Sequence, residues 1–130
     1  MINKNRHITM TKALITISGT TISENEAPFI IAELSGNHGQ SLKLAEEMIL
    51  AAAKAGINAI KLQTYTADTI TLNSRRKEFH IDESSSLWQG ENLYSLYKKA
   101  STPWEWHRDL FLLAKENGLI AFSSPFDESS

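Results

Sequence analysis

Apolar and polar residues alternate over residues 14–22, which is the period of a half-buried β-strand. Gly19 interrupts the alternation with a turn signal, so this segment predicts a small β-hairpin. Residues 29–34 form a nearly continuous apolar run instead. Such runs are typical of strands that are buried on both faces, as in a parallel sheet. The pattern therefore indicates a hairpin followed by the first strand of a separate, buried sheet.

The residues after this strand predict a helix over residues 42–55. Ser41 is a suitable N-cap for it, and Gly56 suits its C-terminal stop. Apolar residues recur with the i, i+3, i+4, i+7 spacing that lines one helical face. The residues with this spacing are Ala45, Met48, Ile49 and Ala52. Residues 59–64 predict a second strand, which completes a β-α-β unit with a right-handed crossover.

The second half of the chain continues the alternation of helices and strands. Residues 65–91 are polar and indicate a long loop, of the kind that often forms a lid or a binding segment. Residues 91–100 predict a short helix. Residues 102–105, with the sequence Thr-Pro-Trp-Glu, predict the capping box of a further helix that ends near Glu116. A third strand over residues 119–123 completes the pattern of an α/β fold with a parallel sheet.

Composition excludes several classes of function. The formal net charge of −2 over 130 residues argues against a basic surface for nucleic acid or for anionic membranes. The chain has no cysteine, which excludes disulfides, thiolate nucleophiles and zinc–sulfur sites. Its apolar runs are far shorter than the roughly 20 residues that span a bilayer. Residues 1–12 lack the apolar core of a secretory signal, so we expect a disordered leader and a cytoplasmic protein.

Polar residues at the strand ends are the candidates for chemistry, because ligands bind at the carboxyl ends of parallel strands. Glu33 lies in an apolar run, where a carboxylate is costly unless it is paired or binds a ligand. It is either an acid/base group or outer-shell partner of a metal or sugar, or the ion-pair partner of Lys61. His38 in the following loop is expected to pack or cap rather than to act in catalysis.

Lys61 and Gln63 lie two residues apart and therefore on the same face of a strand. Lys61 could bind a carboxylate or phosphate, form a Schiff base, or pair with Glu33. Gln63 could present its amide to a substrate or satisfy backbone groups. Ser123 and Ser124 could hold a phosphate or carboxylate, or could simply form a turn.

Taken together, these segments resemble the sialic acid synthase family, whose members make N-acetylneuraminic, pseudaminic and legionaminic acids. The resemblance rests on residues 29–34 with Asn37-His38, on Lys-Leu-Gln-Thr at residues 61–64, and on Phe-Ser-Ser-Pro-Phe at residues 122–126. Within the family the chain is most similar to the pseudaminic acid synthases. That similarity is carried by residues 61–66, 71–73, 91–94, 100–103 and 105–107.

The resemblance implies a fold. Members of the family have a (β/α)₈ barrel that follows a β-hairpin and precedes a small antifreeze-like domain. Residues 13–130 would then hold the hairpin and about three barrel strands, without the C-terminal half of the barrel or the antifreeze-like domain. A barrel of this type needs roughly 250 residues. We therefore expect this length of chain to be inactive by itself. The resemblance also implies that the complete enzyme is a homodimer.

The resemblance also implies a reaction, the condensation of phosphoenolpyruvate with an N-acetylated amino sugar to a nonulosonic acid with release of phosphate. Lys61 and Ser124 would hold the phosphate and carboxylate of phosphoenolpyruvate, while Gln63 and Asn37 would contact substrate. Glu33 and Lys61 would be the catalytic residues. Glu33 would lie near a divalent Mn²⁺ or Mg²⁺ and contact it through water, and the ion would polarise the sugar aldehyde. The metal-binding histidines of the family come from later strands.

Two other functions fit the same residues. The chain could be a non-catalytic sugar- or anion-binding remnant of such a synthase. Less favoured is a Schiff-base aldolase with Lys61 as nucleophile.

Overall fold

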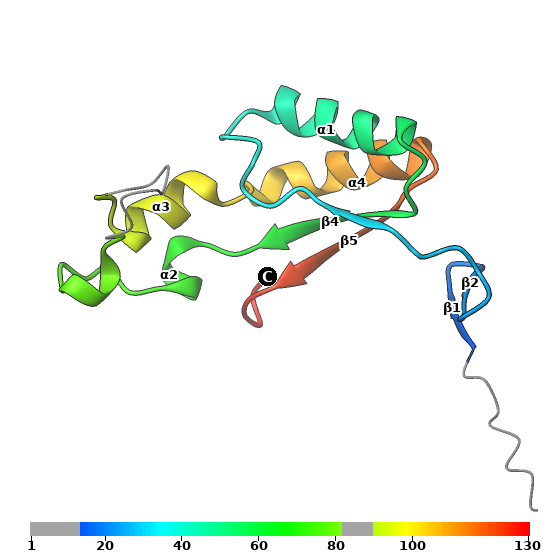
Figure 1. The fold of residues 1–130 in the computed structure, drawn as a ribbon. Helices are drawn as coiled ribbons and strands as arrows, with labels where there is room; N and C mark the ends of the chain where they lie inside the picture. The colour runs from blue at the N-terminus through cyan, green and yellow to red at the C-terminus, as the bar shows by residue number, and fades with distance from the viewer. Residues whose placement is uncertain (1–13, 82–89) are drawn as a thin grey trace, which may run out of the picture.

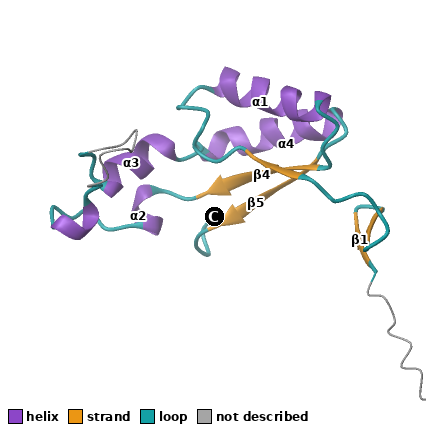
Figure 2. Cartoon of the chain, in the orientation of Figure 1, coloured by secondary structure: helices purple, strands orange, loops and turns teal. Residues whose placement is uncertain are grey.

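A computed structural model describes residues 14–81 and 90–130 of the chain (Figures 1 and 2). The leader predicted over residues 1–12 lies outside the described residues. The elements in chain order are β1 (Ile15–Ile17), β2 (Thr20–Ile22), β3 (Ile31–Glu33), α1 (Leu42–Lys54), β4 (Ala59–Thr64), α2 (Ala67–Ile70), the 3₁₀ turn η1 (Lys77–Phe79), α3 (Leu93–Ala100), the 3₁₀ turn η2 (Trp104–Trp106), α4 (His107–Glu116) and β5 (Ile120–Pro125).

The predicted hairpin is confirmed. Strands β1 and β2 pair antiparallel, with Ile17 opposite Thr20. The two residues between them, Ser18 and Gly19, have φ angles of 47° and 85°. Positive φ at both central positions is the requirement of the tight turns that match the twist of paired strands. The hairpin lies at the end of the molecule away from α3 (Figure 1).

The main sheet is parallel and has the order β3-β4-β5, which confirms the predicted α/β topology. Helices α1 and α4 lie side by side on one face of it (Figure 1). The predicted apolar face of α1 points into this layer, with Ala45 and Ile49 fully buried. Between helices and sheet lies the core, formed by Leu34, Ala45, Ile49, Ile60, Leu62, Leu110, Ala114 and Leu119.

No described helix covers the opposite face of the sheet (Figure 2), although Ile17 of β1 lines a hollow at its hairpin end. The prediction that residues 29–34 are buried on both faces is therefore wrong for this chain. Ile31, which points to that face, is 44% exposed, whereas Leu34, which points to the helices, is fully buried. The apolar run is continuous because one set of side chains faces the helices and the other faces this open side of the sheet.

The segment predicted as a loop over residues 65–91 is partly helical. It contains α2 and η1, and α2 begins with a reciprocal cap in which the Thr66 backbone N–H donates to Thr69 Oγ1 at 3.0 Å. Polar residues concealed this short helix, because threonine is a poor helix former but a good cap. The following helix, α3, begins two residues later than predicted, with Asn92 accepting from the Tyr94 backbone N–H at 2.9 Å.

The capping box predicted at residues 102–105 does not form. The chain makes the 3₁₀ turn η2 first, and α4 starts at His107. Thr102 is 1% exposed, and its hydroxyl lies 3.0 Å from Nε2 of His38. The Thr102 hydroxyl thus bonds His38, which is distant in sequence, instead of capping the helix. Helix α4 ends at Glu116 as predicted, and Gly118 follows with a φ of 79°.

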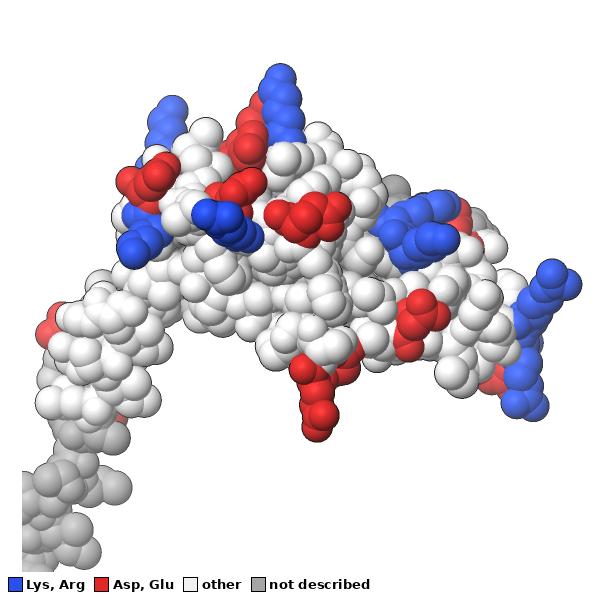
Figure 3. Space-filling view, turned by 180° about the vertical axis from the view of Figure 1, so that it is seen from behind, with Lys and Arg blue, Asp and Glu red and all other residues white. Residues whose placement is uncertain are grey.

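Within the described residues, no helix is both long enough and apolar enough to cross a membrane. Figure 3 shows lysine, arginine, aspartate and glutamate side chains interspersed over the face that it presents. That mixture agrees with the small net charge and gives this face no extended patch of one sign.

Candidate functional site

The open face of the sheet brings the predicted strand-end residues together. Side chains of β4 alternate, so that Leu62 and Thr64 turn toward the helices while Lys61 and Gln63 turn away from them. The strand register then places Glu33 beside Lys61, and Ser124 beside Gln63. Four candidates from three strands therefore share one surface.

This surface changes character along the strands. Near the hairpin it is apolar and encloses a hollow of about 250 Å³. The residues that line the hollow are Ile17, Phe29, Ile31, Ile120 and Phe122. Toward the carboxyl ends it becomes polar, with the Glu33–Lys61 pair followed by the Gln63–Ser124 pair. The polar end is where a parallel α/β fold places its ligands.

Glu33 and Lys61 form an ion pair, as one of the two interpretations of the sequence predicted. Lys61 Nζ lies 2.7 Å from Glu33 Oε1, and the two side chains are 25% and 49% exposed. The pair is therefore open to solvent rather than sealed in a core. An ammonium has three N–H donors, so one carboxylate oxygen leaves it able to bind a second anion.

Ser124 lies in the sheet and not in a turn. Strand β5 runs to Pro125, two residues beyond the predicted end, and Ser124 pairs in register with Gln63. The turn interpretation of the two serines is thus wrong. The structure also separates them, because Ser123 turns to the helix side, where its hydroxyl contacts Thr64 at 2.6 Å.

Asn37 and His38 lie in the loop between β3 and α1. Asn37 donates from Nδ2 to the Leu34 carbonyl oxygen at 3.2 Å, which fixes the loop against the end of β3. His38 is fully buried, and its ring packs edge-on against Trp106 with 5.5 Å between centroids. The prediction that His38 packs rather than catalyses agrees with this position.

The hydrogen bonds of His38 fix its tautomer. Nδ1 accepts from the Gln40 backbone N–H at 3.2 Å, so it carries no proton. The proton must be on Nε2, which donates to Thr102 Oγ1 at 3.0 Å. The bond that Nδ1 accepts requires the neutral ring, and burial lowers the pKa of His38 from its ordinary value of 6.5.

This pKa shift predicts a loss of stability in mild acid. Unfolded His38 takes up a proton below about pH 6.5, whereas the folded ring resists it, so the unfolded state binds more protons. The His38 contribution is complete above pH 6.5 and declines as the pH falls toward the lower folded pKa. The slope lies between the folded pKa and 6.5, where it cannot exceed about 1.4 kcal/mol per pH unit, and it vanishes once both states are protonated. Urea unfolding at a series of pH values, compared with His38→Gln, measures it, and an NMR titration placing His38 at or above 6.5 contradicts the expectation.

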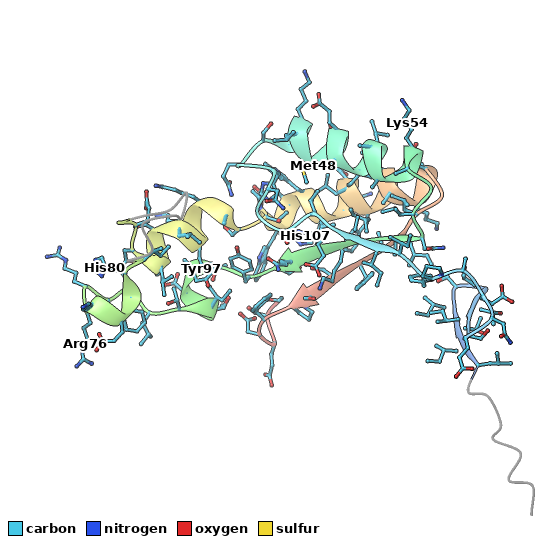
Figure 4. All side chains as sticks on the ribbon, in the orientation of Figure 1. Met48, Lys54, Arg76, His80, Tyr97 and His107 are labelled. Carbon is cyan, nitrogen blue, oxygen red and sulfur yellow. The ribbon has the colours of Figure 1, made fainter. Side chains whose placement is uncertain are left out.

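Two residues of the helix side, His107 and Thr64, were missed by the sequence reasoning, and Ser123 was predicted in a different role. His107 of α4 lies between that helix and the sheet (Figure 4), with Nε2 2.8 Å from Thr64 Oγ1. Thr64 Oγ1 in turn lies 2.6 Å from Ser123 Oγ, which links β4 to β5. The alternation of side chains along each strand could have indicated the positions of Thr64 and Ser123. Thr64 follows Gln63 and Ser123 precedes Ser124, so each faces the side opposite to its neighbour.

An aromatic cluster also lies at the carboxyl ends of β4 and β5. Tyr65 is 3% exposed and contacts the rings of Tyr97 and Phe126 edge-on, at centroid distances of 5.8 and 5.3 Å. Burial raises the pKa of Tyr65. The cluster joins α3 to the ends of β4 and β5, and so fixes the helical segment beside the polar end of the open face (Figure 4).

The described residues do not by themselves suit a divalent metal. Within residues 14–81 and 90–130, no three histidine, aspartate or glutamate side chains gather where they could share an ion. Glu33, the one residue predicted near a metal, already contacts Lys61. Carboxylate-rich ligation of Mg²⁺ or Mn²⁺ would need groups from outside these residues.

Comparisons with known proteins agree on one family. The NeuB family model matches residues 48–130 of the chain. The chain is 53% identical over 98 residues to a pseudaminic acid synthase of Campylobacter jejuni, which covers 75% of this chain and 28% of that protein. It is 50% identical over 105 residues to the pseudaminic acid synthase of Helicobacter pylori, covering 81% and 30% respectively.

Solved structures give the same answer for the fold. An N-acetylneuraminic acid synthetase from Leptospira borgpetersenii matches with a TM-score of 0.70 and 30% identity, over 91% of this chain and 36% of that one. The spore coat polysaccharide biosynthesis protein SpsE of Bacillus subtilis matches with a TM-score of 0.61 and 31% identity, over 90% and 29%. These matches confirm the predicted hairpin and partial barrel. The chain spans less than a third of the length of the curated relatives described above.

Proposed function

The chain belongs to the NeuB family, and we propose on that premise that it supplies the phosphoenolpyruvate-binding part of a sialic-acid-type synthase. The proposed reaction joins phosphoenolpyruvate to an N-acetylated amino sugar, and pseudaminic acid is the proposed product. The observation that carries the proposal is the convergence of Glu33, Lys61, Gln63 and Ser124 on the open sheet face. Identity of 50–53% to pseudaminic acid synthases supports the choice of product.

Lys61 is the proposed anchor for the anionic substrate. Its ammonium is held by Glu33 at 2.7 Å in a partly open position, which orients it without using all of its donors. Charge-assisted hydrogen bonds to phosphate or carboxylate are stronger than neutral ones. Lys61 would therefore contribute most of the attraction for phosphoenolpyruvate, and Glu33 would position it.

Gln63 and Ser124 lie one step further toward the carboxyl ends of β4 and β5. A hydroxyl can donate to a phosphate or carboxylate oxygen, and an amide can both donate and accept. We assign Ser124 to the anion and Gln63 to the amino sugar. Asn37, held against the end of β3, is assigned to substrate from the neighbouring loop.

The proposed reaction is a condensation of phosphoenolpyruvate with the sugar aldehyde, followed by addition of water and release of phosphate. The enol carbon of phosphoenolpyruvate forms the new bond to the aldehyde carbon of the sugar, whose oxygen takes up a proton. Water adds to the cationic carbon left behind, and the carbon–oxygen bond to phosphate breaks. Glu33 lies beside the Lys61 ammonium, where a carboxylate can hold or move the proton of that water or of the new hydroxyl.

The proposal includes a divalent metal. Mn²⁺ or Mg²⁺ would supply Lewis acidity to the aldehyde, and its ligands would have to come from outside the described residues. We also propose a homodimer for the complete enzyme, a cytoplasmic location, and no activity for this length of chain alone.

Calorimetric titration tests the proposed substrate. The chain should bind phosphoenolpyruvate more tightly than pyruvate, which lacks the phosphate, and more tightly than inorganic phosphate, which lacks the carboxylate. Binding of an anionic sugar in place of phosphoenolpyruvate would favour the non-catalytic remnant instead. Equal affinity for pyruvate and phosphoenolpyruvate would contradict the proposal.

Borohydride treatment with pyruvate tests the aldolase reading. The ammonium of the Glu33–Lys61 ion pair is not nucleophilic, whereas a Schiff base requires the free amine. We therefore expect no covalent adduct at Lys61 by mass spectrometry. An adduct at Lys61 would support the aldolase.

A further inference from the structure

Hydrogen bonds link His107, Thr64 and Ser123 in a row on the helix side of the sheet, and the donor of each bond can be assigned. His107 Nδ1 lies 3.3 Å from the Pro103 carbonyl oxygen, which can only accept, so the ring proton is on Nδ1. Nε2 is then an acceptor, and Thr64 Oγ1 donates to it at 2.8 Å. Because that hydroxyl proton is used, the 2.6 Å contact between Thr64 and Ser123 has Ser123 as donor.

This chain ties three elements together at one level of the fold. It begins on β5 with Ser123, passes through Thr64 of β4 to His107 at the start of α4, and ends at the Pro103 carbonyl just before η2. The bond between Ser123 and Thr64 crosses between two strands and therefore limits their separation on the helix side. Thr64 is 9% exposed, whereas His107 and Ser123 are half-buried, so water competes least at the Thr64 hydroxyl in the middle of the row.

The same level of the sheet carries the proposed ligand groups on its other face. Gln63 directly precedes Thr64, and Ser124 directly follows Ser123. Gln63 and Ser124 are also partners in the strand register. The bond between Thr64 and Ser123 helps to set the spacing and tilt of the two strand ends. A change in that bond would therefore move Gln63 and Ser124, each of which is one peptide unit away.

We propose that His107, with Thr64 and Ser123, is a positioning residue that sets the geometry of Gln63 and Ser124 from the opposite side of the sheet. Its relevance to the reaction rests on the proposed function of those two residues. His107 touches no substrate in this proposal; it acts through the hydroxyl chain. Small displacements of binding groups have large effects on ligand geometry, so such support belongs to a site that must be held still.

NMR on the complete 130-residue chain tests the proposal without any ligand. The long-range ¹H–¹⁵N spectrum should show His107 with its proton on Nδ1, opposite to His38, whose proton is on Nε2. His107→Phe keeps a ring against Phe111 but loses the acceptor. It should shift or double the side-chain amide signals of Gln63, a residue 44 positions away in sequence.

Two further variants separate positioning from general stability. His107→Gln keeps an acceptor within reach of Thr64 and should return the Gln63 amide signals toward those of the original chain. His80→Phe is the matched control, because His80 is exposed and its ring nitrogen Nδ1 hydrogen-bonds the Arg76 carbonyl of its own turn, far from Thr64 (Figure 4). It should leave the Gln63 signals unchanged.

The proposal is overturned if His107 carries its proton on Nε2, or if His107→Phe affects Gln63 no more than His80→Phe does. It is also overturned if the His107→Gln variant shifts the Gln63 amide as far as the His107→Phe variant. Failure of the proposed function would appear elsewhere, as an unsubstituted chain that does not bind phosphoenolpyruvate. The two failures are therefore distinguishable, because the amide signals are read in the absence of that ligand.

Discussion

Replacing Gly36 by alanine is expected to destabilise the chain by about 1–3 kcal/mol, the range for forcing an extra methyl into a packed site. A Cβ at this position would lie 2.8 Å from Ala100 Cβ and 2.8 Å from the Ala100 carbonyl oxygen. One of these neighbours is backbone, which cannot rotate away. Urea unfolding of Gly36→Ala against the original chain measures the loss, and an unchanged free energy of unfolding would contradict this expectation.

The same loop provides the control. A Cβ at Gly39 meets nothing within 4 Å, although its φ of 53° opposes any side chain. Gly39→Ala should therefore cost only the backbone term of about 1 kcal/mol. Combining Gly36→Ala with Ala100→Gly removes the contact between the two Cβ atoms but leaves the one with the carbonyl oxygen. The double variant should therefore recover part of the loss and not all of it.

The close approach at Gly36 belongs to a larger joint between the β3–α1 loop and the segment after α3. His38 bonds Thr102 at 3.0 Å, and Gln40 Nε2 donates to the carbonyl oxygens of Lys99, at 3.0 Å, and Ser101. These contacts fix the loop that carries Asn37 beside the strand ends. Loss of the joint should thus disturb the proposed site as well as lower the stability.

Replacing Lys61 by methionine should weaken binding of phosphoenolpyruvate while changing the stability little. A hydrogen bond to a charged group contributes about 1.5–3 kcal/mol, which corresponds to roughly a 10- to 150-fold rise in Kd. The Glu33–Lys61 pair is partly exposed, so its loss should cost only about 0–1 kcal/mol of folding free energy. Calorimetric titration and urea unfolding of the same variant separate the two effects.

Glu33→Gln is the matched substitution for Lys61→Met. It removes the carboxylate charge and keeps the shape of the side chain, so Lys61 stays but loses its charged partner. Binding of phosphoenolpyruvate should be retained in this variant, because the ammonium is the group proposed to attract it. If Glu33→Gln weakens binding as much as Lys61→Met does, the anchor is the pair and not the lysine.

Much of the fold follows from local patterns. The hairpin over residues 14–22 and the helix between Ser41 and Gly56 depend on periodicity and caps, which act over a few residues. The strand positions of Glu33 and Lys61 were also predictable, because a polar residue in an apolar run stands out in the sequence.

The features that were missed depend on contacts between distant residues. Thr102 has the sequence of a cap, but a histidine 64 residues away uses its hydroxyl. His107 and Thr64 are ordinary in sequence and meet only because α4 packs on the helix side of β4. The exposure of Ile31 could not be read from the apolar pattern either, since that pattern does not state what covers each face.

Phosphoenolpyruvate is expected to bind the open sheet face at the polar strand ends. A ¹H–¹⁵N NMR titration of the 130-residue chain with millimolar phosphoenolpyruvate measures where it binds. We expect shifts grouped at Lys61, Gln63 and Ser124, together with their loss in Lys61→Met. Shifts grouped instead on the outer surfaces of α1 and α4, or an unchanged spectrum at saturating concentration, would contradict it.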